Sequence, residues 1–412
     1  MQFYNVHTHI FTMNNAPRRF LELYLPKWAA HSVDKITNTQ VGAWLVKKLL
    51  NTVGGHGGKR YASFLEIGKS SSQNDVFRHL IESYEDSSIK MVALTLFMEK
   101  LGADASMSGY EGQLEEIIAL KRRYPERLLP FFCIDPRWKN DGAAILATTQ
   151  RYFDRKINVS GKEYSPFAGI KIYPSTGFYP FDAKLMPVME WAAKNGVPVM
   201  THCSYLGGIF NNDVDFVKAS LNPYDPYDRV YYDKPCYISG DKKARVNNQR
   251  SCSYFLEPHA YESMIRYFAE KGTPLKICFA HFGSDKHMLL EHKKDQTPQK
   301  YYGVLADKNW TAQIKDLMTR YPEVYTDISY SLTKLETHDF IFEELRNAYY
   351  GDRILFGTDF FMTEREEKEQ KTYTHFKSRA LKEKNVSDAG NAWEKIAMLN
   401  PEQFLKSNYY QT

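Results

Sequence analysis

Short apolar runs alternate along the chain with longer stretches in which apolar residues recur at the helical period. Eight of the apolar runs have strand length: Phe3–Val6, Met91–Phe97, Leu128–Ile134, Phe167–Tyr173, Val197–His202, Leu275–His281, Val324–Ile328 and Arg353–Asp359. The stretches between them include expected helices at Asn74–Glu85, Glu111–Tyr124, Asp182–Asn195, Tyr261–Lys271 and Thr311–Tyr321. Repeated strand–helix units predict a parallel sheet. Eight such units predict an α/β fold closed into a (β/α)8 TIM barrel.

Two segments are too long for a minimal barrel, and we expect them to be insertions into one domain that spans residues 1–412. The first covers about 12–72, after the first strand, and the second about 205–257, after the fifth strand. Because both follow strands, both are expected to rise from the carboxyl-terminal face of the barrel, where active sites lie. We therefore expect them to form lids or walls of a substrate pocket.

Composition narrows the classes of partner. The formal net charge of +5 is spread over 412 residues with acidic and basic side chains interleaved, which favours neither nucleic acid nor a membrane surface as a partner. No apolar run reaches transmembrane length, and the amino-terminal residues lack a signal-peptide pattern. The five cysteines form no CxxC motif, which is typical of reduced, buried thiols. We expect a cytoplasmic protein that acts on a small molecule.

Ionisable side chains lie at the carboxyl ends of several expected strands. His7 and His9 close the first strand, and their spacing of two places them on one face. Other strands bring Lys171, His202, His281 and Asp359 to equivalent positions, from which all can point into the barrel. Each of these residues alone has an ordinary explanation, such as a core histidine, a helix cap or a lysine that reaches solvent.

Several such groups at one barrel mouth compensate one another only around a cation or in a tight polar network, because a buried charge without a partner is costly. Three imidazoles and a carboxylate are good ligands for zinc or a similar divalent ion. The sequence therefore predicts a metal site formed by His7, His9, His202 and Asp359. The remaining histidines fall in expected loops or helices and are interpreted as surface or packing residues.

The ordered motifs resemble a known family. They are HTH on the first strand, GIKIYP on the fourth, MTHC on the fifth, FAHFG on the sixth and LFGTDF on the eighth. This set is similar to the amidohydrolase superfamily, and in particular to the amidohydrolase-related branch that includes aminocarboxymuconate semialdehyde decarboxylase. The segment Glu394–Leu405 is similar to the terminal helix of that branch. The resemblance spans almost the whole chain and is specific for the superfamily, but not for a substrate.

The resemblance implies a role for each matching residue. His7, His9 and His202 would be metal ligands, and Asp359 would be both a ligand and the group that takes a proton from the metal-bound water. His281 would orient that water or stabilise an oxyanion. Lys171 matches a lysine that in many members is carboxylated and bridges two metals, although in this branch one metal often suffices. We expect one ion, zinc, with manganese or iron as alternatives, and leave a second ion open.

Three functions fit these observations. The first is hydrolysis of an amide, ester or lactone, with the metal activating water. The second is non-oxidative decarboxylation of an unsaturated or aromatic acid, in which a basic side chain holds the carboxylate. The third is a barrel that has lost catalysis and serves as a binding or structural module, against which the intact set of metal ligands argues. Candidate substrate-binding residues are Tyr173, Arg60, Arg229, Arg245 and Arg250. Homodimerisation is left open.

Overall fold

The computed structural model describes residues 2–18, 72–204, 255–294, 309–384 and 389–411, together with isolated positions at 70, 216, 219–220, 222–224 and 386. Arg60, Arg229, Arg245 and Arg250 lie outside these residues, as do most of the two expected insertions. Within the described part of the chain, no helix combines the length and the apolarity needed to span a bilayer.

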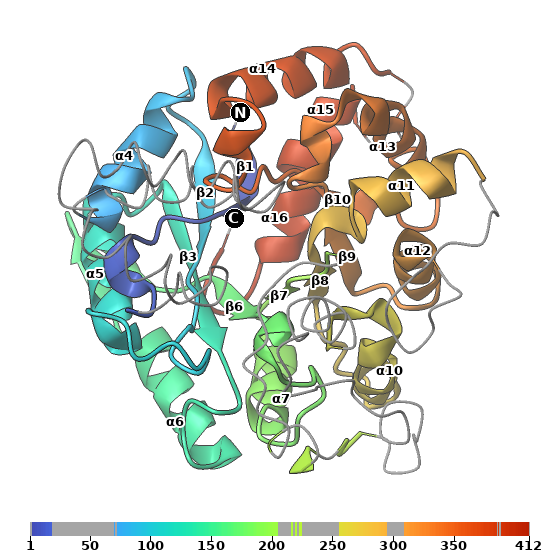
Figure 1. Cartoon of the computed structure of the whole chain (residues 1–412). Helices are drawn as coiled ribbons and strands as arrows, with labels where there is room; N and C mark the ends of the chain where they lie inside the picture. Colours follow the sequence, from blue (N-terminus) through green and yellow to red (C-terminus); the bar gives the residue numbers. More distant parts are fainter. Residues whose placement is uncertain are drawn as a thin grey trace, which may run out of the picture.

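Eight parallel strands form one sheet in the order of the chain, which confirms the predicted fold (Figure 1). The strands are β1 (Tyr4–Thr8), β2 (Lys90–Leu94), β3 (Leu128–Ile134), β6 (Gly169–Ile172), β7 (Val199–Thr201), β8 (Ile277–Phe279), β9 (Val324–Asp327) and β10 (Ile354–Leu355). Each lies within or overlaps one of the predicted apolar runs. Backbone hydrogen bonds from Val6 N to Phe356 O (2.9 Å) and from Asp359 N to His7 O (2.9 Å) join the first strand to the chain that follows the last one. The barrel is thereby closed at its carboxyl-terminal end.

Helices surround the sheet on its outer side (Figure 1). Those after β1 to β6 are α4 (Gln73–Glu82), α5 (Gly109–Arg123), α6 (Gly142–Phe153) and α7 (Met186–Asn195). Those after β7 to β10 are α10 (Glu262–Glu270), α11 (Asp285–His292), α12 (Trp310–Arg320), α13 (His338–Glu344) and α14 (Glu369–Ala380), and the chain ends in α15 (Ala392–Glu394), a π-helical turn (Lys395–Leu399) and α16 (Asn400–Leu405). Side-chain caps start several of them, including Ser72 at α4 and Asp141 at α6.

Two local features differ from the sequence-based expectation. Helix α7 begins at Met186 rather than Asp182, because Pro187 has no N–H to donate to a preceding turn and therefore favours the first turn of a helix. A short antiparallel hairpin of β4 (Ile157–Val159) and β5 (Lys162–Tyr164), which the apolar pattern did not predict, precedes β6.

The inside of the barrel has its own apolar core, separate from the layer between strands and helices. It is formed by alternate strand residues and by two residues of α16: Tyr4, Val6, Val92, Leu94, Leu129, Phe131, Ala168, Met200, Cys278, Tyr325, Leu355, Phe404 and Leu405. The terminal segment also reaches the start of β2, where Lys90 Nζ donates to Tyr410 Oη (2.7 Å). The carboxyl-terminal segment thus packs at the amino ends of the strands, and polar residues gather at the opposite end.

Candidate metal centre

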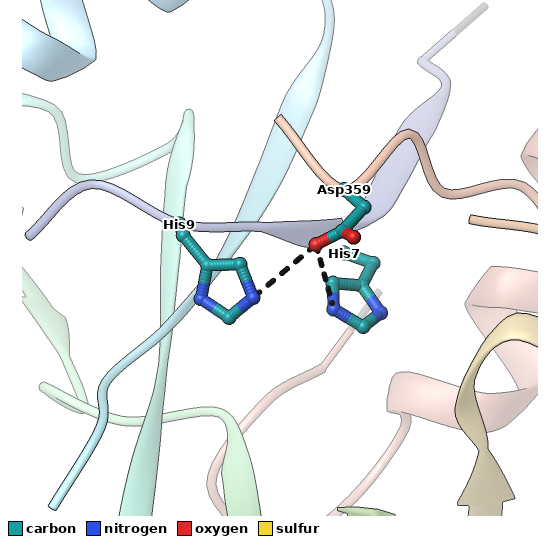
Figure 2. A group of neighbouring side chains, drawn as sticks. All are labelled: His7, His9 and Asp359. Carbon is teal, nitrogen blue, oxygen red and sulfur yellow. Dashed lines mark ion pairs between the residues drawn. The ribbon is translucent and has the colours of Figure 1, made fainter. Parts of the chain in front are cut away.

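The end of β1 places two imidazoles in the barrel because the strand carries a bulge. Asn5 pairs with Met91 and Thr8 pairs with Ala93, so three steps on β1 match two on β2. Val6 belongs to the inner core, and the extra residue lets His7 reach the interior as well. The rings of His7 and His9 then lie 5.3 Å apart, with both turned toward Asp359 (Figure 2).

Asp359 brings a carboxylate between these rings. Its Oδ1 lies 3.5 Å from His7 Nε2 and 3.4 Å from His9 Nε2 (Figure 2). Asp359 has a left-handed φ of 63°, which turns its side chain away from the path of the strand. Burial acts to raise the pKa of Asp359, but the hydrogen bond with His9 and the nearby His7 ring hold it below its usual value. The group is therefore a carboxylate at neutral pH.

A second part of the site lies beside the first. His202 follows β7, and its Nδ1 is 3.1 Å from Nε2 of His281, which follows β8. The His281 ring is also 4.9 Å from the His7 ring, so the histidines form one continuous row. Burial, and then the neighbouring His281 and Lys171, lower the pKa of His202 well below its ordinary value. The His202 ring is therefore neutral.

Lys171 extends from β6 into the same region. Its side chain is buried, and its Nζ has no hydrogen-bond partner within the part of the chain that the structure describes. Burial lowers the pKa of Lys171 to about 8, although Asp327 and Asp359 oppose this effect. Among the other predicted residues, Tyr173 lies beside the site with its ring 4.7 Å from that of His202.

The sequence analysis missed one carboxylate of the site, that of Asp327 at the end of β9. Its Oδ2 lies 2.9 Å from His7 Nδ1, and its Oδ1 accepts from the backbone N of His281 (2.9 Å) and of Ser329 (2.9 Å). Its position was visible in the sequence, because Asp327 follows the inward-facing Tyr325 by two residues at a strand end. Burial lowers the pKa of His7 to about 4 even though the Asp327 carboxylate opposes that shift.

The residues present suit a divalent cation. One ligand atom from each of His7, His9 and Asp359 lies within 4.8 Å of the others. Nε2 of His7 and Nε2 of His202 are buried and have no hydrogen-bond partner among the described residues, which is unusual for buried polar atoms unless something else binds them. Neutral imidazoles and an ionised carboxylate are also the donors that zinc and manganese accept. Ligand atoms of His7, His281 and Asp327 lie equally close together. Among the described residues, His202 belongs to neither group, and it reaches the site beside His281.

Comparison with known proteins places the chain in a family. The amidohydrolase profile matches residues 84–405, well over half of the sequence. The chain belongs to the amidohydrolase family. Among solved structures, 5-carboxyvanillate decarboxylase from Novosphingobium aromaticivorans is similar in fold, with 14% identity, a TM-score of 0.51 and coverage of 98% of this chain and 97% of that one. A protein described as amidohydrolase II has 12% identity, a TM-score of 0.50 and coverage of 98% and 99%. No curated protein sequence matches.

Membership of the amidohydrolase family confirms the resemblance inferred from the motifs and identifies the chain as an enzyme of a metal-dependent family. The matched region includes β6 to β10 and thus Lys171, His202, His281 and Asp359. It begins after β1, so His7 and His9 lie outside it. These two histidines join the site through the fold, since β1 pairs with β2 on one side and contacts the chain after β10 on the other.

Proposed function

We propose that this amidohydrolase is a metal-dependent hydrolase of an amide, ester or lactone. The observation that carries the proposal is the meeting of His7, His9 and Asp359 at the carboxyl-terminal end of the barrel, with their ligand atoms within reach of one ion. We assign these three residues, with His202, to a single divalent ion. When bound, such an ion supplies Lewis acidity that polarises a carbonyl group and acidifies water.

The protein's own groups supply the remaining chemistry in this proposal. Asp359 is ionised and buried, so it can accept a proton from the attacking water and later return it to the leaving group. His281 has its Nδ1 3.1 Å from Ser329 O and its Nε2 3.1 Å from His202 Nδ1. We therefore assign His281 to holding His202, in place of the contact with water or an oxyanion that the family resemblance implied. Tyr173 would form part of the substrate pocket wall.

A second candidate function, non-oxidative decarboxylation, is favoured by Lys171. Its Nζ is buried beside the histidines, and no described residue forms a hydrogen bond with it, so the amine could hold a substrate carboxylate. The amine is half protonated near pH 8, because burial lowers its pKa to about 8. Binding of a carboxylate would stabilise the charged form.

The test follows both reactions in the same samples. Metal is removed from the purified protein with a chelator, and the protein is reloaded with zinc or with manganese, which is present in the solved decarboxylase. Each sample is then incubated with a panel of amides, esters, lactones and unsaturated or aromatic acids. Hydrolysis is followed by mass spectrometry and decarboxylation by CO2 release. We expect metal-dependent hydrolysis that Asp359→Asn reduces by at least about a hundredfold, while Asp316→Asn, at an exposed position on α12, leaves it unchanged. Release of CO2 without hydrolysis would refute the first proposal in favour of the second.

A further inference from the structure

We propose that Asp327 and Ser329 are positioning residues that fix the proton positions on two imidazoles, so that His7 and His202 both present an unprotonated Nε2 to the metal. This inference rests on the proposed metal centre and deepens it. The two residues flank Ile328 at the end of β9, a strand that contributes none of the four ligands assigned above. These two polar residues would then determine which ring nitrogen carries the proton in His7 and in His202, which lie at the ends of two other strands.

The first branch runs from Asp327 to His7. Asp327 Oδ2 lies 2.9 Å from His7 Nδ1, and both side chains are fully buried. An ionised carboxylate can only accept a hydrogen bond, and Ser329 Oγ, 3.0 Å from the same nitrogen, gives its own proton to Asp327 Oδ1, so His7 Nδ1 carries the proton. A neutral imidazole carries one ring proton, which leaves His7 Nε2 with a free lone pair. That atom has no hydrogen-bond partner and faces Asp359 at 3.5 Å.

The second branch runs from Ser329 through His281 to His202. Nδ1 of His281 lies 3.1 Å from the backbone oxygen of Ser329, which can only accept, and 2.9 Å from Ser329 Oγ, which donates its own proton to Asp327 Oδ1. His281 Nδ1 therefore carries the proton. With the proton held at Nδ1, we assign His281 Nε2 as the acceptor and His202 Nδ1, 3.1 Å away, as the donor. His202 Nε2 is left unprotonated, and it is buried without a hydrogen-bond partner.

The Asp327 carboxylate cannot rotate without losing several hydrogen bonds. Its Oδ1 accepts from the backbone N–H of His281 (2.9 Å), from that of Ser329 (2.9 Å) and from Ser329 Oγ. These donors fix Oδ1 on one side, so only Oδ2 faces His7. Partners of this kind orient metal-binding histidines in many proteins, and their removal weakens metal binding by about tenfold to a hundredfold.

The arrangement makes Asp327→Asn a directional test. The two backbone N–H groups can only donate, so they retain the amide oxygen of the asparagine at the Oδ1 position. The amide nitrogen then faces His7 Nδ1 and, as a donor, disfavours a proton on that atom, while Ser329 Oγ, 3.0 Å from His7 Nδ1, can still accept from it. We expect the proton of the His7 ring to move to Nε2, the atom assigned to the metal. The substitution changes almost no volume, so its effect on His7 is separable from repacking.

The primary measurement uses metal-free protein labelled with 15N at histidine, with His7→Gln and His202→Gln spectra to assign the signals. At neutral to mildly alkaline pH we expect Nδ1-protonated rings for His7 and His202 in the wild type. In Asp327→Asn we expect the His7 ring to become Nε2-protonated while His202 stays unchanged. Nε2-protonated rings at both positions in the wild-type protein would overturn the proposal, even if the variant fails to fold.

The second measurement is metal affinity, determined by competition with a chromophoric chelator for zinc and for manganese. We expect Asp327→Asn to weaken binding by about tenfold to a hundredfold. Asp182→Asn, a matched change at another buried aspartate that accepts hydrogen bonds outside the site, should retain wild-type affinity. Wild-type affinity in Asp327→Asn would refute the positioning role. Neither measurement uses a substrate, so an absence of hydrolysis would refute the proposed function alone.

Discussion

Burial of a carboxyl group behind the site makes the stability of this protein depend on pH. Glu369, the first residue of α14, is completely buried, and its Oε1 accepts from Thr358 Oγ1 (2.7 Å) and from Tyr84 Oη. Asn5 Nδ2 lies near the same oxygen at 3.4 Å, while Oε2 has no hydrogen-bond partner. Burial raises the pKa of Glu369 from 4.5 to about 7, more than these hydrogen bonds lower it.

The size and sign of the effect follow from this shift. The folded state holds the proton more tightly than the unfolded state, so ionisation of Glu369 destabilises the fold. The cost is absent below the unfolded pKa of 4.5 and complete above the folded pKa of about 7. A shift of about 2.5 pKa units, at 1.36 kcal/mol each, corresponds to about 3 kcal/mol. Most of that loss falls between about pH 5 and pH 8.

Glu369→Gln keeps the shape and the accepting oxygen but cannot ionise. We therefore expect the variant to gain stability relative to the wild type as pH rises, by about 2 to 3 kcal/mol between pH 5 and pH 8. The assay is urea unfolding of metal-free protein at several pH values, with midpoints compared at a shared slope. Glu82→Gln, at an exposed position of α4, is the control and should follow the wild type. Parallel pH profiles for wild type and Glu369→Gln would refute this reasoning.

Three further predictions concern the barrel interior. His202→Ala should lower bound metal measured by elemental analysis, from about one ion per chain to well below one; unchanged content would exclude His202 as a ligand. Lys171→Met should retain about one ion per chain, because an unmodified amine is not required to hold it; a fall from about two ions to one would instead make Lys171 a bridging ligand. Gly169→Ala should cost about 1 to 3 kcal/mol in urea unfolding, because its Cβ would lie 2.4 Å from the Phe131 ring; an unchanged midpoint would contradict that packing.

The fold was predictable because each barrel strand is buried on both faces, and such a strand appears in the sequence as a nearly continuous apolar run. The ends of the strands were less predictable, as the last one shows. The apolar pattern extends to Asp359, whereas β10 covers only Ile354–Leu355. Beyond it the chain is shaped by the site. Gly357 has no room for a Cβ, which would lie 2.8 Å from that of His7, and Asp359 adopts a left-handed conformation. Such contacts between distant residues leave no periodic signal.

The site was predictable in part. Residue type and spacing identified His7, His9 and Asp359, which the structure brings together. The orientation of His7 did not follow from strand alternation, because Val6 faces the inner core and a regular strand would turn His7 outward. The bulge that reverses this depends on pairing with β2, which the β1 sequence does not reveal. Asp327 lies at the end of its strand, as the other candidates do. No histidine adjoins it in the sequence, so it is not part of a recognisable metal-ligand motif.

The carboxyl end of β1 is held from both faces, and the two sets of contacts adjoin where Asn5 Oδ1 accepts from the backbone N of His7 (3.3 Å). On the helix side, the Asn5 side chain donates to Thr358 Oγ1 (2.8 Å) and to Tyr84 Oη (2.9 Å), which ties the strand to the residue before Asp359. On the inner side, Asp327 holds the ring of His7. The substituted side chains belong to different networks, although the Asp359 charge also acts on Glu369. We therefore expect Glu369→Gln to act mainly on the pH dependence of stability, and Asp327→Asn mainly on metal affinity. A metal centre requires such support, since ligands must be held within about 0.5 Å of their working positions.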